Sequence, residues 1–120
     1  MLLTNNWRFK ELKNIDILYE KKSSLDILIH ARDLVHLGYK LMTHPLYANL
    51  KPREMLYRSI YLVKTNSMDL ESVMLIEEAI SKLQMANFKR REYNQSVKDD
   101  FSYIDFEIVK DALRQGGIDV

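Results

Sequence analysis

Four short apolar runs and three longer segments, in which apolar residues recur every three or four positions, follow one another along the chain as two runs, one segment, two runs and two segments. The short runs cover residues 2–4, 15–19, 41–43 and 59–63. Their β-branched, leucine and tyrosine content, bounded by polar residues, is typical of β-strands. Residues 7–13 have room for one or two helical turns between the first two strands.

The three longer segments predict helices. The first follows a capping serine, Ser23 or Ser24, and ends at Gly38, because glycine adopts the left-handed conformation that closes a helix. The second follows Ser67 or Asp69 and extends to about residue 88, and the third begins at residue 100 or 102 and ends before residues 116–117. The inward faces are expected to comprise Ile27, Leu28, Ala31, Leu34 and Val35, then Val73, Ile76, Ile80 and Leu83, then Ile104, Ile108, Val109 and Ala112.

The order of these elements indicates the fold class. It contains one strand-helix-strand unit, which predicts a parallel pair of strands joined by a right-handed crossover. A chain of 120 residues has the commonest size of a single domain. We therefore predict one α/β domain over residues 1–120, with a small mixed, largely parallel four-stranded sheet covered by about three main helices.

Composition excludes several classes of function. The 18 basic and 17 acidic residues give a net charge of +1, so no overall positive field favours nucleic acid as a partner. The chain has no cysteine, which excludes disulfides, thiolate metal sites and thiol nucleophiles. No apolar run approaches the ~20 residues of a membrane helix, and the start turns polar after three residues, unlike a signal peptide. We expect a cytoplasmic protein without a membrane partner.

Polar residues follow the first and third predicted strands. In open α/β sheets the carboxyl ends of the strands line the ligand crevice, and the loop after residue 45 adds cations beside it. The first and third strands should be parallel neighbours or near neighbours, so we expect Thr4, Asn6, His44 and Tyr57 to lie close together and partly exposed. The candidate ligand-binding or partner-binding residues are Thr4, Asn5, Asn6, Thr43, His44, Lys51, Arg53, Tyr57 and Ser59.

Each of these residues also has an ordinary structural interpretation. Polar turn residues commonly bond nearby backbone, and charged loop residues are commonly solvated. As functional groups, the lysine and arginine can hold a carboxylate or phosphate, and His44 can transfer a proton near neutral pH. Both interpretations stay open on the sequence alone.

The sequence contains no recognisable nucleophile–base pair, nucleotide loop or paired-histidine metal motif. His30 has Asp26 four residues before it and Asp33 three after it, which is typical either of a metal site or of an exposed ion-pair face. His36 lies too far round the helix to be a third ligand. We expect no metal and no cofactor.

Two central blocks, residues 38–46 (GYKLMTHPL) and residues 51–60 (KPREMLYRSI), resemble the GrdX family. The resemblance extends to residues 4–6, 32–33, 36–38, 76–77 and 104–105, and so covers most of the chain. GrdX proteins are small and are encoded beside glycine, sarcosine and betaine reductase components in anaerobes that ferment amino acids. The resemblance implies a metabolic setting and does not imply an activity.

Together, these observations favour a non-enzymatic accessory or regulatory protein that binds a reductase component or a small anion at the His44/Lys51 crevice. One alternative is an enzyme in which His44 is the acid or base, Lys51 holds a carboxylate and residues 4–6 orient the substrate. Another is a structural homo-oligomeric subunit, and a homodimer remains open in each case.

Overall fold

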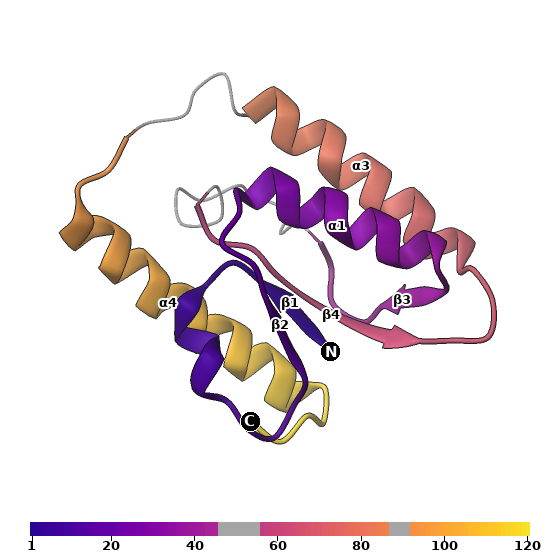
Figure 1. Cartoon of the computed structure of the whole chain (residues 1–120), viewed down its shortest axis with the longest axis horizontal. Helices are drawn as coiled ribbons and strands as arrows, with labels where there is room; N and C mark the ends of the chain where they lie inside the picture. Colours follow the sequence, from indigo (N-terminus) through magenta and orange to yellow (C-terminus); the bar gives the residue numbers. More distant parts are fainter. Residues whose placement is uncertain (46–55, 87–91) are drawn as a thin grey trace.

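A four-stranded sheet with helices on both faces forms the centre of the fold (Figure 1). The computed structural model describes residues 1–45, 56–86 and 92–120. The strands are β1 (Leu2–Thr4), β2 (Ile17–Tyr19), β3 (Tyr39–Leu41) and β4 (Ser59–Lys64), and their order in the sheet is β2-β1-β4-β3. Three of the strands lie where the apolar runs predict them, whereas β3 spans Tyr39–Leu41 rather than residues 41–43, so that Thr43 follows the strand.

The prediction of a largely parallel sheet is wrong, because the sheet is mixed. β1 pairs with β2 in parallel, whereas β4 pairs antiparallel with both β1 and β3. β2 and β3 do run in the same direction, but they occupy opposite edges of the sheet. β4 has inserted between β1 and β3, where antiparallel pairing needs no helical crossover. The single strand-helix-strand unit in the sequence carries no information about the direction of β4.

Helices α1 (Ser24–His36) and α3 (Leu70–Ala86) lie side by side on one face of the sheet (Figure 1). The Ser23 hydroxyl caps α1 by accepting a hydrogen bond from the backbone N–H of Asp26 at 3.1 Å. Gly38, with φ of 102°, turns the chain out of the helix into β3. The main core between these helices and the sheet consists of Leu3, Ile27, Leu28, Ala31, Val35, Leu41, Ile60, Leu62, Ile76, Ala79, Ile80 and Leu83.

The opposite face carries the short 3₁₀ helix η1 (Trp7–Glu11) and helix α4 (Gln95–Gln115). Successive side chains of a strand point to opposite faces, so Leu2 lies in this second layer while Leu3 lies in the first. Leu2 and Phe9 pack with Val109 and Leu113 to form a smaller core. The result is three layers, with the sheet in the middle.

Helix α4 differs most from its prediction. It begins at Gln95, capped by Asn94, rather than at residue 100 or 102. Its buried residues are Ser102, Asp105, Val109 and Leu113, whereas Ile104 is 43% exposed, Ile108 is 38% exposed and Ala112 is also exposed. The inward orientation predicted for Ile104, Ile108 and Ala112 is therefore wrong. The reason is the pair of hydrogen bonds from the Asn6 side chain to Ser102 and Asp105, which we call the Asn6 anchor and describe below. These bonds turn the Ser102 and Asp105 side of the helix toward β1.

No helix within the described ranges combines the length and apolar character that crossing a bilayer requires.

Leu28→Ala tests the main core. Leu28 is fully buried, so its truncation should lower the free energy of unfolding by about 2–5 kcal/mol, through lost burial and the cavity left behind. Met74→Ala is the control, because Met74 is 73% exposed and its truncation should change stability by about 0.5 kcal/mol or less. Denaturant unfolding measures both. Equal losses would contradict this assignment of the core.

Candidate functional site

Most of the described residues of the predicted site lie at one end of the sheet, which we call the carboxyl edge. The carboxyl ends of β1, β2 and β3 lie at the same edge as the amino end of β4, because β4 runs antiparallel to its neighbours. Thr4 is directly opposite Ser59 in the β1–β4 register, and their hydroxyl oxygens are 2.7 Å apart. The structure thus joins two predicted site residues that are far apart in the sequence.

Asn6 is buried and connects this edge to α4. Its Oδ1 accepts a hydrogen bond from the backbone N–H of Arg8 at 3.1 Å and so caps η1. Its Nδ2 donates to the backbone oxygen of Ser102 and to Asp105 Oδ2, both at 2.9 Å. The backbone N–H of Asn6 donates to Thr4 Oγ1 at 3.0 Å. The expected partial exposure is wrong for both Asn6 and Thr4, which have no accessible surface.

Asn5 makes a corresponding set of contacts on the opposite side of the strand end. Its Nδ2 donates to the backbone oxygens of Lys22 at 2.9 Å and Leu56 at 2.8 Å, and its Oδ1 accepts from the backbone N–H of Arg58 at 2.8 Å. These three bonds connect β1 to the segments that follow β2 and precede β4. The contacts of Asn5 and Asn6 agree with the interpretation that the polar turn residues tie backbone segments together.

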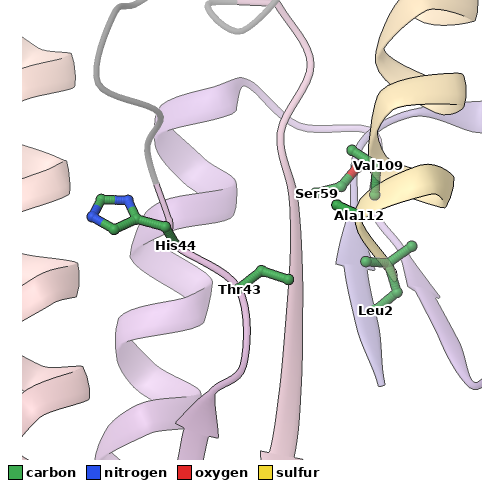
Figure 2. Close-up of a pocket in the computed structure, with 6 residues that line it drawn as sticks. All are labelled: Leu2, Thr43, His44, Ser59, Val109 and Ala112. Carbon is green, nitrogen blue, oxygen red and sulfur yellow. The ribbon is translucent and has the colours of Figure 1, made fainter. Parts of the chain in front are cut away.

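Thr43 and His44 border a small cavity of about 200 Å³ beside α4, together with Leu2, Ser59, Val109 and Ala112 (Figure 2). Thr43 Oγ1 accepts a hydrogen bond from the backbone N–H of Tyr61 at 3.1 Å. His44 is exposed, and Figure 2 shows its imidazole pointing away from Ser59. Lys51 and Arg53, the predicted cations of this crevice, lie outside the described residues.

A larger groove of about 530 Å³ lies at the same edge of the sheet and includes Asn5 and Tyr57. Three lysines from two separate parts of the chain line it: Lys21 and Lys22 shortly after β2, and Lys98, the fourth residue of α4. The rest of its lining consists of Trp7, Tyr19, Ser23, Ser24, Leu25 and Leu56. We call this feature the lysine groove.

The lysine groove was missed by the sequence prediction. A signal was present in Lys21-Lys22, since this pair follows a strand just as Asn5-Asn6 does. No signal pointed to Lys98, because its place depends on where α4 begins. The Tyr57 hydroxyl donates to the backbone oxygen of Lys98 at 3.2 Å and so holds α4 against the segment before β4. Burial raises the pKa of this hydroxyl, which keeps it protonated as a donor.

The charges around the groove are only partly compensated. Lys22 Nζ lies 2.6 Å from Glu20 Oε2, and this contact raises the pKa of Lys22. Glu20 also lies in close contact with His30 Nδ1, and this contact is an ion pair when the imidazole is protonated. The hydrogen bond from Lys22 is the main reason that the pKa of Glu20 is lowered. Within the described residues, the ammonium groups of Lys21 and Lys98 make no hydrogen bond or ion pair. Among the described residues, two of the three groove cations are therefore not engaged by another side chain.

The His30 region has the character of an ion-pair surface. His30, Asp26 and Asp33 line a shallow depression together, but the carboxylate in contact with the imidazole belongs to Glu20. In the parts of the chain that the structure describes, no group of three histidine, aspartate or glutamate side chains has the arrangement of a metal site.

Comparison with known proteins gives one match. A family model described as GrdX-like protein matches residues 1–114 of the 120-residue chain. No curated protein and no solved structure matches it.

Asn6→Ala tests the buried amide. The substitution leaves the Arg8 N–H, the Ser102 carbonyl and the Asp105 carboxylate without this partner, at a cost of about 1–3 kcal/mol for each buried group left unsatisfied. We expect the free energy of unfolding to fall by at least about 2 kcal/mol. Asn94→Ala is the matched control, because Asn94 also caps a helix but is exposed and should cost about 1 kcal/mol. A smaller loss for Asn6→Ala than for Asn94→Ala would contradict the structural role.

Glu20→Gln tests the ion pairs through their pH dependence. The pKa of Glu20 is lower in the folded protein than the value of about 4.3 for an unfolded chain, so its ionised form stabilises the fold above that pH. This contribution should disappear as the pH falls through the folded pKa. Urea unfolding at several pH values should therefore show wild type more stable than Glu20→Gln at pH 6, with the difference shrinking below about pH 4. A difference that grows on acidification would contradict the assignment.

Proposed function

The chain belongs to the GrdX-like protein family, and from that premise we propose that it is a non-enzymatic accessory or regulatory protein of glycine, sarcosine or betaine reductase systems. In this proposal it acts by binding a reductase component or a small anion. The family name supports the metabolic setting, and the geometry of the lysine groove supports the mode of action.

The observation that carries the binding proposal is the convergence of Lys21, Lys22 and Lys98 on one groove. An anion entering it would meet two ammonium groups that are not already paired within the described residues. Charge-assisted hydrogen bonds from lysine are about twice as strong as neutral ones. An anionic group on a partner's surface or on a free effector is therefore a suitable ligand.

The groups that an enzyme would need to orient a substrate are already committed to the fold. Thr4 and Asn6 are buried and bonded within the protein, and the His44 imidazole points away from Ser59. These positions favour binding over turnover at this edge. His44 is exposed, so we keep it as a candidate partner contact together with Lys51 and Arg53.

Charge reversal of the groove tests the proposal. Lys21→Glu with Lys98→Glu should weaken association with purified reductase components, or with small carboxylates such as glycine and betaine analogues, by about tenfold or more, because two attractions become repulsions. Isothermal titration calorimetry measures the affinity. Lys82→Glu is the control, since it reverses a lysine on α3 that does not line the groove.

A melting curve for each variant establishes that it is folded. Unchanged affinity in the folded double variant would reject the groove as the binding surface. In that case loss of affinity in His44→Ala with Lys51→Ala would move the site to the crevice predicted from the sequence. Consumption of a candidate substrate, abolished by His44→Ala, would replace the accessory role with an enzymatic one.

A further inference from the structure

The lysine groove combines its cations with aromatic rings, and this combination narrows the class of anion that it fits. Trp7, Tyr19 and Tyr57 line it alongside the three lysines. Trp7 is 44% exposed. An exposed indole adds nothing to the binding of a bare carboxylate or phosphate, whereas a ligand that carries a flat ring can stack on it.

Two of the rings are held in place from outside the groove. The Arg8 guanidinium lies 4.5 Å from the centroid of the Trp7 ring, and Lys10 Nζ lies 4.2 Å from the centroid of Tyr19. Arg8 is itself fixed, because its Nε donates to Ser102 Oγ at 2.8 Å. Rings that are already positioned lose little conformational entropy when a ligand stacks on them.

The type of cation favours phosphate over carboxylate. Planar carboxylates are matched best by the fork of an arginine, whereas lysine acts as a point charge and is a common phosphate ligand. All the cations that line the groove are lysines. Arg58, only 3% exposed, lies behind the wall with its Nε 3.2 Å from Ser24 Oγ, so it helps to fix the wall and does not face the ligand.

We propose that the lysine groove binds a nucleoside phosphate, with the base against the aromatic side chains and the phosphates against the lysines. This inference rests on the proposed function, in that it takes the groove to be the anion-binding site, and it adds the identity of the ligand class. The volume of about 530 Å³ lies within the range of small-molecule sites.

The sequence supplies a direct probe, because Trp7 is the only tryptophan. Titration with ADP should change the Trp7 fluorescence, and calorimetry should give a Kd for ADP about tenfold lower than for either inorganic pyrophosphate or adenosine. Trp7→Leu should reduce the affinity for ADP to that for pyrophosphate. Lys21→Ala with Lys98→Ala should reduce it to that for adenosine.

Tyr103→Leu is the matched control for Trp7→Leu. The Tyr103 ring also lies against Arg8, with its centroid 5.5 Å from the guanidinium carbon, but it does not line the groove. The affinity of Tyr103→Leu for ADP should equal that of wild type. If Trp7→Leu fails to fold, Trp7→Phe keeps an aromatic ring and should retain most of the affinity.

Two results would overturn the inference. One is that ADP binds no more tightly than pyrophosphate, and the other is that ADP does not bind and leaves the fluorescence unchanged. Either result leaves the proposed function standing if a reductase component still binds through Lys21 and Lys98. Conversely, ADP binding that depends on Trp7, without binding of any reductase component, would support the inference and remove the partner from the proposed function.

Discussion

The arrangement of the whole carboxyl edge depends on hydrogen bonds from two consecutive side-chain amides. Asn5 and Asn6 follow β1 and point to opposite sides, as neighbouring residues in extended backbone do. Asn5 bonds the segments after β2 and before β4, while Asn6 bonds η1 and α4. Each amide replaces water with protein partners for several backbone groups that would otherwise be buried unsatisfied. Together they connect the end of β1 to the loop that leads into α1, to the segment before β4, and to η1 and α4.

The anchor explains the unusual face of α4. An amphipathic helix normally buries its most apolar side, and for this helix that side includes Ile104 and Ile108. Asn6 instead requires the Ser102 carbonyl and the Asp105 carboxylate to face the sheet. The isoleucines then face outward, while Val109 and Leu113 are buried and Phe106 is partly buried against the same core. Hydrogen bonding of a buried amide has therefore outweighed part of the hydrophobic burial.

The Asn6 anchor also shows which features of the fold can be predicted from the sequence and which cannot. β1 and the cap of α1 follow from local patterns, because an apolar run and a capping serine act over a few residues. The direction of β4 and the rotation of α4 depend on partners far along the chain, such as Asn6 with Asp105, and no local pattern encodes them. For the candidate site, the sequence identified the polar edge but not the division of labour within it. Asn5 and Asn6 serve the fold, whereas the lysines of the groove near them were absent from the predicted set.

The separation between asparagines that hold the fold and lysines that line the groove also determines how the carboxyl edge can recognise a ligand. Side-chain hydrogen bonds fix the walls of the lysine groove, because the Asn5 amide holds the Lys22 and Leu56 carbonyls and the Tyr57 hydroxyl holds the Lys98 carbonyl. The lysine ammonium groups lie near the surface, and hydrogen bonds to the Lys22 and Lys98 carbonyls hold the backbone that carries them. With a net charge of +1, the protein has no long-range field, so attraction to an anion acts over roughly a Debye length of 8 Å at physiological salt. Recognition must then depend on the local geometry of lysines and rings, and this geometry rests on the two asparagines.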